Sequence, residues 1–322
     1  MTLSHDEKMT YHRALIQIVR EVGESLRNYT GEITDMEIRK GHEFSTLDDF
    51  AGRQIMAAID RYLSNFDGTV VRELNVREVH EHASRQRRKR HVIISDELEG
   101  TTNYKRKKCS ENPDGPVNSS VTMAFATDEN LAAIEVGAVY SFFDGATYSA
   151  FADAVDAKGV RYLSFRNGTL MDPRNFEDSR GDQAKRIIVV GYSNKERGKK
   201  AEIEAALVEE KFRIYDGCRS STNDVLNMLA DNQFDAYIDP RALWPGSGAM
   251  LQAYDIAGVL PIAAGCGLVV TDIFGESIRN YGIESTIPIV IARPTVYEAV
   301  LRAVEPVATG YRSPKVVSIA HE

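Results

Sequence analysis

The segment Asp96-Glu97-Leu98-Glu99-Gly100-Thr101-Thr102-Asn103 follows an apolar run, His91-Val92-Ile93-Ile94-Ser95, that predicts a short buried strand. Three carboxylates, a glycine, two hydroxyls and an amide therefore stand at one strand end. Carboxylates are ligands that Mg2+ prefers, and a Gly-Thr-Thr turn leaves backbone N–H groups free to hold an anion. The segment indicates metal-assisted phosphate chemistry, although an Asp and a Glu around such a turn also often cap a helix or close a loop.

Size and composition are those of a globular protein with room for two packed halves. The chain has 322 residues, of which 43% are hydrophobic and 27% charged, and a net charge of −8. The negative balance gives no support to a nucleic-acid partner. No apolar run approaches the roughly 18 residues of a membrane span, so no membrane partner is expected. Three widely spaced cysteines and a polar N-terminus predict a cytoplasmic protein.

Apolar periodicity predicts an α/β protein in two halves. The first half has helical patterns at 9–30 and 46–65, short strands at 69–71 and 92–94, and an antiparallel sheet with strands at 121–127, 135–141 and 147–152. The second half alternates strands with helices at 196–210, 222–231, 251–265 and 295–307. A polar segment at 166–185 separates them. We therefore predict an N-terminal half at 1–180 and a C-terminal half at 181–322.

Segments spread over roughly residues 45 to 275 resemble, in the same order, the inositol monophosphatase family of lithium-sensitive, magnesium-dependent sugar-phosphate phosphatases. The family's first signature, Asp-Pro-Ile/Leu-Asp-Gly-Thr-Thr-Asn, is similar to residues 96–103. Its second, Trp-Asp-x-Ala-Ala-Gly and a later Ala-Gly-Gly turn, looks like Tyr254-Asp255-Ile256-Ala257-Gly258 and residues 264–272. Weaker likenesses lie at three further segments: Ser45-Thr46-Leu47-Asp48, Val70-Val71-Arg72-Glu73, and Ser220-Ser221-Thr222-Asn223 leading to Asp235-Ala236-Tyr237.

The resemblance implies a layered α-β-α-β-α sandwich, with an antiparallel sheet in the N-terminal half and a mixed sheet in the C-terminal half. It also implies two or three Mg2+ ions. Glu73, Asp96 and the carbonyl of Leu98 would hold the first ion, and Asp96, Glu99 and Asp255 the second. A homodimer is expected because homodimers are common in the family.

The resemblance further assigns catalytic and binding roles. Thr101, positioned by Asp48 or Asp49, would help deprotonate a metal-bound water that attacks in line. The N–H groups of Gly100, Thr101 and Thr102 would hold the phosphate. The sugar pocket would include Thr222 and Asp239. Plain alternatives stay open, because an acidic residue near a helix start stabilises the helix without any catalytic role.

Within the two signatures the chain departs from the family at three positions: Glu99 replaces an Asp, Tyr254 a Trp, and Glu97 a Pro. The change at Glu99 adds one methylene, which moves the carboxylate by more than a magnesium octahedron tolerates. We therefore expect either a backbone adjustment or a preference for a larger ion such as Mn2+.

A basic run, Lys105-Arg106-Lys107-Lys108, follows the phosphate loop directly and lies in an inserted segment. A charge run is usually a solvated face. Its position beside the loop nevertheless predicts that Lys105 and Lys107 contact a second anionic group, as in a bisphosphate or a nucleotide.

Two functions remain open. The first is hydrolysis of a small phosphate monoester, of inositol, a sugar or a nucleotide, by a metal-activated water. The second is a catalytically impaired family member that serves as a phosphate-binding or scaffolding subunit. Glu99, Arg72 and Leu74 favour the second because the family has Asp, Gly and Glu at these positions.

Overall fold

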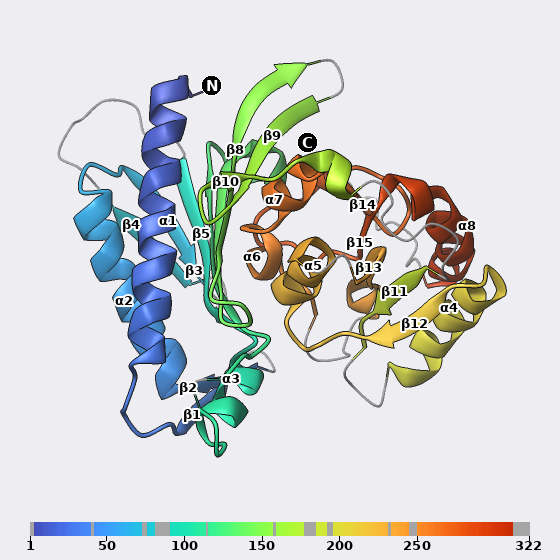
Figure 1. Cartoon of the computed structure of the whole chain (residues 1–322), viewed down its shortest axis with the longest axis horizontal. Coiled ribbons are helices and arrows are strands. Elements are labelled where there is room, and N and C mark those ends of the chain that lie inside the picture. The colour runs from blue at the N-terminus through green and yellow to red at the C-terminus, as the bar shows by residue number, and fades with distance from the viewer. Residues whose placement is uncertain are drawn as a thin grey trace, which may run out of the picture.

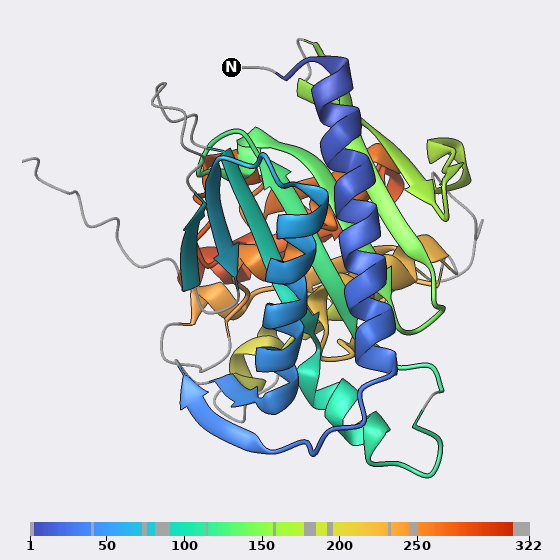
Figure 2. The ribbon, with the colours of Figure 1, turned by 90° about the vertical axis from the view of Figure 1, so that its left-hand side faces the viewer.

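Two helices lie side by side on the outer face of the larger sheet (Figures 1 and 2). α1 (His5–Arg27) begins with reciprocal hydrogen bonds between Ser4 and Glu7, and α2 (Thr46–Tyr62) follows a hairpin of β1 (Asp35–Arg39) and β2 (His42–Ser45). The structure, a computed structural model, describes residues 3–39, 42–72, 76–80, 91–113, 115–156, 159–176, 185–191, 196–230, 233–244 and 250–311.

The larger sheet has eight strands in the spatial order β10-β9-β8-β7-β6-β5-β3-β4. The strands are β3 (Gly68–Arg72), β4 (Val76–His80), β5 (His91–Glu99), β6 (Ser120–Ala126), β7 (Ile134–Ser141), β8 (Thr147–Asp156), β9 (Gly159–Arg166) and β10 (Thr169–Leu170). The sheet is mixed and not purely antiparallel, because β3 pairs in parallel with β5. β4 reverses the chain beside β3, and β5 then lies on the other side of β3, so that β3 and β5 run in one direction.

The smaller sheet is mixed, as predicted, with five strands in the order β12-β11-β13-β15-β14. β11 is parallel to β12 and β13, and β15 is antiparallel to β13 and β14. The strands are β11 (Arg186–Val189), β12 (Arg213–Asp216), β13 (Ala236–Asp239), β14 (Val269–Asp272) and β15 (Ile289–Ala292).

Helices fill the space between the two sheets and cover the outer face of the smaller one (Figure 1). The inner helices are α5 (Ser221–Ala230), α6 (Ala253–Ile256) and α7 (Leu260–Gly265), and the outer ones are α4 (Arg197–Glu209) and α8 (Pro294–Gly310). Short 3-10 turns lie at Leu131–Ala133, Pro173–Phe176, Arg241–Leu243 and Ile278–Asn280. None of the helices in the described residues has the length and apolar character that a membrane crossing needs.

Three apolar clusters confirm the five-layer α-β-α-β-α sandwich. The first packs α1 and α2 on the larger sheet, and the third packs α4 and α8 on the smaller sheet. The middle cluster contains residues of both sheets, from Val71 on β3 to Ile291 on β15, together with the inner helices. The predicted boundary near residue 180 lies outside the described residues. The division into 1–180 and 181–322 is therefore still a proposal.

The helix predicted at 251–265 is two short helices, α6 and α7, which meet at Gly258. A Cβ at Gly258 would overlap Thr122 Oγ1 and lie 2.8 Å from Met123 O, so glycine lets the chain approach β6 closely. Pro261 lies in the first turn of α7, where the missing N–H costs no helical hydrogen bond. The break orients α6 separately, and α6 contains Asp255.

The burial of His12 on α1 predicts that the protein becomes less stable as the pH decreases. Its Nε2 lies 3.0 Å from Ser149 Oγ, and burial lowers the pKa of His12 to about 4. Between pH 6.5 and 4 the unfolded chain therefore binds a proton that the folded chain excludes. His12 should make the free energy of unfolding fall by at most about 1.4 kcal/mol per pH unit as pH decreases through this window.

Urea unfolding at several pH values measures this slope. His12→Gln should flatten it, and His5→Gln, on the exposed first turn of the same helix, should leave it unchanged. Equal slopes for the native chain and His12→Gln would contradict the assignment.

Candidate active site

The loop between β5 and α3 (Thr101–Lys108) contains a left-handed turn at Gly100, whose φ is 80°. A Cβ at this position would lie 2.8 Å from Asn118 O and 3.0 Å from Ser220 Cβ, so glycine is required for both conformation and space. The turn leads directly into the N-terminus of α3, where the first amides of a helix lack intrahelical partners. The predicted phosphate-binding amides of Thr101 and Thr102 lie here.

The hydroxyl of Thr101 lies between two acceptors. Its Oγ1 is 2.8 Å from Asp48 Oδ1 and 2.7 Å from the carbonyl oxygen of Leu98. One hydroxyl proton serves one acceptor at a time, so Thr101 donates either to the Asp48 carboxylate or to the Leu98 carbonyl. Burial raises the pKa of Asp48, against hydrogen bonds from Ser45 and Thr101 that lower it. Asp49, the other predicted partner, instead forms an ion pair with Arg53 on the surface of α2.

Two of the three predicted ligands of the first metal ion, Asp96 and the carbonyl of Leu98, lie on the last residues of β5. Asp96 is buried and its Oδ1 accepts a hydrogen bond of 3.2 Å from the amide of Leu98. The pairing of β5 with β6 shifts register between Asp96 and Glu99, and such irregularities redirect side chains. Glu97, in place of the family's Pro, pairs with Arg72 at 3.1 Å. Glu73 lies outside the described residues.

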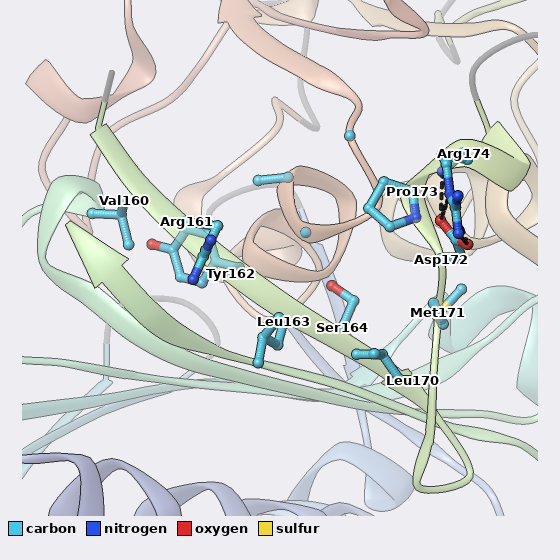
Figure 3. A pocket seen from close by; sticks show the side chains of 13 residues that line it. Val160, Arg161, Tyr162, Leu163, Ser164, Leu170, Met171, Asp172, Pro173 and Arg174 are labelled. Carbon is cyan, nitrogen blue, oxygen red and sulfur yellow. Dashed lines mark hydrogen bonds and ion pairs between the residues drawn. The ribbon is translucent and has the colours of Figure 1, made fainter. Parts of the chain in front are cut away.

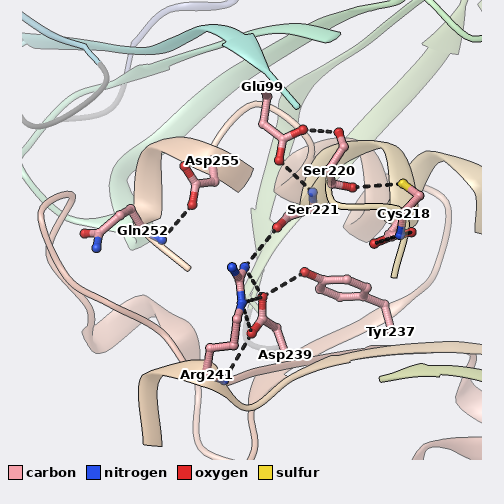
Figure 4. A network of polar contacts seen from close by, with 10 residues as sticks. Glu99, Cys218, Ser220, Ser221, Tyr237, Asp239, Arg241, Gln252 and Asp255 are labelled. Carbon is pink, nitrogen blue, oxygen red and sulfur yellow. Dashed lines mark hydrogen bonds and ion pairs between the residues drawn. The ribbon is translucent and has the colours of Figure 1, made fainter. Parts of the chain in front are cut away.

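Glu99 is directed at the N-terminus of α5 (Figure 4). Its Oε2 accepts a short hydrogen bond from the hydroxyl of Ser220, and its Oε1 accepts one of 2.6 Å from the amide of Ser221. Burial, and then the nearby charge of Asp255, raise the pKa of Glu99 to about 8, although the hydrogen bonds act in the opposite direction. Both oxygens of this predicted metal ligand are therefore engaged within the protein.

Asp255 and Thr222 meet where α6 and α5 begin. Asp255 Oδ2 accepts a hydrogen bond of 2.8 Å from the amide of Gln252, and Thr222 Oγ1 donates to the carbonyl of Asp255 at 2.6 Å. Burial raises the pKa of Asp255 to about 7. Asp224, one turn into α5, accepts from the amide of Cys218 at 2.9 and 3.1 Å, and burial raises its pKa to about 7 as well.

Arg241 is a buried cation at this site that sequence reasoning missed. Its guanidinium forms a two-pronged ion pair with Asp239, with Nη2–Oδ2 of 2.6 Å and Nε–Oδ1 of 2.9 Å, and its Nη2 lies 3.4 Å from Ser221 Oγ. Tyr237 donates to the same carboxylate at 3.1 Å. Opposite charges two residues apart, in Asp239-Pro240-Arg241, were the available signal. The role of Asp239 in the sugar pocket stays a prediction.

Four carboxylates thus gather at this place: Glu99, Asp224, Asp239 and Asp255. Burial and, to a smaller extent, mutual repulsion raise the pKa values of three of them, so a cation at this place would favour their ionised forms. Within the described residues, no three His, Cys, Asp or Glu side chains are arranged to hold a metal ion. The donor chemistry suits a cation, but the direction of Glu99 leaves the second predicted ligand set incomplete.

The basic run divides into side chains with different surroundings. Lys105 lies near enough to Asp48 to act on its charge, and Lys108 Nζ donates to the carbonyl of Arg27 at 2.6 Å. A Cβ at Gly115 would lie 2.5 Å from Lys107 Nζ, so Lys107 extends toward the loop after α3. Of the two predicted substrate contacts, Lys105 is therefore nearer the phosphate loop.

A cavity of about 700 Å3 lies elsewhere, between β9, the segment after β10, and the C-terminus of α7 (Figure 3). Apolar side chains such as Leu163, Leu170 and Met171 line it, and none of the predicted site residues does. This cavity is therefore separate from the predicted site.

Comparison with known proteins agrees with the sequence resemblance. The model of the inositol monophosphatase family matches residues 7–309. None of the curated proteins compared with the chain matches it.

Solved structures with inositol monophosphatase (IMPase) descriptions have a similar fold. The Thermotoga maritima IMPase is 19% identical with a TM-score of 0.63, over 92% of this chain and 97% of that one. Staphylococcal SaIMPase-II with bound inositol monophosphate is 17% identical with a TM-score of 0.65, over 94% and 98%. An IMPase/NADP phosphatase complexed with Mg2+ and phosphate is 16% identical with a TM-score of 0.58, over 88% and 89%. At such identities the likeness concerns the fold alone.

The buried pair of Asp239 and Arg241 predicts a large stability effect. Asp239→Ala should lower the free energy of unfolding by about 3–5 kcal/mol, because it leaves a buried guanidinium without its main partner. The double change Asp239→Leu with Arg241→Met should recover much of this loss. Asp153→Ala, which breaks an exposed pair with Arg161, is the control and should cost at most about 1 kcal/mol.

Urea unfolding of the four proteins tests this prediction. Loss of substrate affinity in Asp239→Ala without loss of stability would instead assign Asp239 to the substrate.

Proposed function

The chain belongs to the inositol monophosphatase family, and on that premise we propose that it hydrolyses a small phosphate monoester with the help of a divalent metal ion. The observation that supports this best is the position of Thr101. Its hydroxyl lies 2.8 Å from Asp48 Oδ1, at the start of a helix whose first amides are placed to hold a phosphate.

Residues of the chain would bind and orient the phosphate and deprotonate the attacking water. The amides of Gly100, Thr101 and Thr102 would hold the phosphate oxygens. Thr101 Oγ1 would accept a proton from the attacking water while its own proton passes to Asp48 Oδ1. A raised pKa suits Asp48 for this task, because a base works best when its pKa approaches the working pH.

Asp96, the carbonyl of Leu98 and Glu73 are the residues that would hold a metal ion, and Asp255 would contribute from α6. When bound, Mg2+ or Mn2+ would lower the pKa of a coordinated water and offset negative charge on the phosphate. An IMPase/NADP phosphatase of similar fold was crystallised with Mg2+ and phosphate, which supports the choice of ion.

The substrate class we propose is a phosphorylated inositol, sugar or nucleotide. Inositol monophosphate was bound to SaIMPase-II, and 2'AMP to another structure of that protein. Thr222, at the start of α5, is the residue we assign to the alcohol part of the substrate, with Asp239 behind it. A homodimer and a cytoplasmic location are part of the same proposal.

A catalytically impaired, phosphate-binding subunit is the second candidate. The engagement of both oxygens of Glu99 with Ser220 and Ser221 favours it, because a predicted metal ligand is then occupied. Phosphate release from a panel of inositol, hexose, fructose-bisphosphate and nucleotide phosphates, with Mg2+ or Mn2+, separates the two functions. The enzyme releases phosphate, whereas the binding subunit retains its ligand without turnover.

Substitutions at the proton-transfer pair test the catalytic proposal. Thr101→Val and Asp48→Asn should each lower kcat by roughly 100-fold or more, the usual contribution of general-base catalysis. Asp49→Asn should retain most activity, because Asp49 pairs with Arg53. Steady-state phosphate release gives kcat for each variant, and a greater loss in Asp49→Asn than in Asp48→Asn would reverse the assignment.

The position of Lys105 beside the phosphate loop predicts selectivity for substrates with a second anionic group. Lys105→Met should raise KM for a bisphosphate by roughly tenfold, as expected for the loss of a charge-assisted hydrogen bond, and leave KM for a monophosphate nearly unchanged. Arg106→Met, at the exposed neighbouring position, is the matched control and should change neither KM. Equal effects of Lys105→Met on the KM of both substrates would contradict a contact between Lys105 and the second anionic group.

A further inference from the structure

The carboxylate of Glu99 joins the phosphate loop to the N-terminus of α5. It accepts from the hydroxyl of Ser220 and, at 2.6 Å, from the amide of Ser221. The two partners are 121 and 122 residues away in the sequence. The acceptor oxygens of Glu99 thereby satisfy one of the first amides of α5, which lack partners within the helix.

The receiving site for Glu99 is built from further buried contacts. Ser220 Oγ accepts from Asn223 Nδ2 at 2.6 Å, and the same amide group lies 3.1 Å from Ser120 Oγ. This fixes the direction of the Ser220 hydroxyl, which has only one proton to donate, toward Glu99.

Asn103 joins the loop to the same region in a second way. Its Nδ2 donates to the carbonyl oxygens of Asn118 and Cys218, each at 2.7 Å. Gly100 also packs directly against Ser220, with 3.0 Å between the position of its absent Cβ and Ser220 Cβ. The loop therefore contacts residues 218–221, which lead into α5, through Glu99, Gly100 and Asn103.

The length of Glu99 decides whether this contact forms. Aspartate at the same position is shorter by one C–C bond of about 1.5 Å, so its carboxylate would stop short of the Ser221 amide. A hydrogen bond of 2.6 Å stretched by that amount would no longer be a hydrogen bond. The extra methylene that departs from the family pattern is thus what lets Glu99 reach α5.

Positive charge beside Asp255 comes from the chain itself. The buried guanidinium of Arg241 lies 3.4 Å from Ser221 Oγ (Figure 4). Its positive charge acts to lower the pKa of Asp255, against the effect of burial. Arg241 is held there by its two-pronged pair with Asp239. Arg241 therefore lies near enough to Asp255 for its positive charge to act on that carboxyl group.

We propose that Glu99 is a positioning residue that holds the phosphate loop against the start of α5, and that the site consequently binds one divalent ion where the family resemblance implied two or three. Arg241 and the N-terminus of α5 supply the positive charge that the further ions would bring. This inference rests on the proposed function, because that function assigns a divalent ion to Asp96 and the Leu98 carbonyl at the end of β5.

Counting bound ions tests the proposal without any need for turnover. The full chain is titrated with Mn2+ by calorimetry and by the paramagnetic resonance signal of free Mn2+. The native chain and Glu99→Gln should each bind one ion, and Glu99→Asp, whose shorter carboxylate is released from α5, should bind a second. Glu298→Asp, on the exposed face of α8, is the control and should match the native chain.

Hydrogen exchange at the amide of Ser221 tests the contact of Glu99 with α5 itself. Glu99→Asp should speed exchange there by about tenfold, as for the loss of a helix N-cap, whereas Glu99→Gln keeps an acceptor oxygen and should retain protection. Two ions on the native chain, or none, would overturn the proposal, as would unchanged protection in Glu99→Asp. One ion and a protected amide without phosphate release would uphold it and refute the phosphatase function instead.

Discussion

The arrangement depends on the burial of several carboxylates in the space between two sheets. Glu99, Asp224 and Asp239 are buried there and Asp255 is half-buried, and an isolated buried charge is costly unless hydrogen bonds or an opposite charge satisfy it. Backbone amides at the starts of α5 and α6 and the guanidinium of Arg241 donate hydrogen bonds to these carboxyl groups and so stabilise them. These groups lie at or near the starts of the inner helices.

The middle layer is the part of the fold that makes the site. β5 delivers Asp96 and Glu99 from the larger sheet, and α5 and α6 present their N-termini toward it from the other side. Short helices suit this position because each start provides amides for an anion. The break at Gly258 separates α6 from α7, so that α6 begins beside Thr222 while α7 packs on the larger sheet.

Much of the fold could be predicted because it follows from local patterns. The apolar spacing of α1 and α2 and the alternation of the second half placed those elements within a few residues of their observed bounds. The hairpin at residues 35–45 and the strands β4 and β9 were not predicted. The parallel pairing of β3 with β5 was missed too, since strand order in a sheet depends on contacts between distant segments.

By itself, the sequence determined the chemical groups at the site and the turn that presents them. The left-handed Gly100, the hydroxyl of Thr101 and the order of the segments are local properties, so they could be read from residues 96–103 and their family likeness. Only the tertiary structure decided that Asp48 and not Asp49 meets Thr101, that Arg241 lies beside Asp239 and Ser221, and that Glu99 reaches α5. The physical reason is that the direction of a buried polar side chain depends on which donors and acceptors the fold brings to it, and these come from elements far away along the chain.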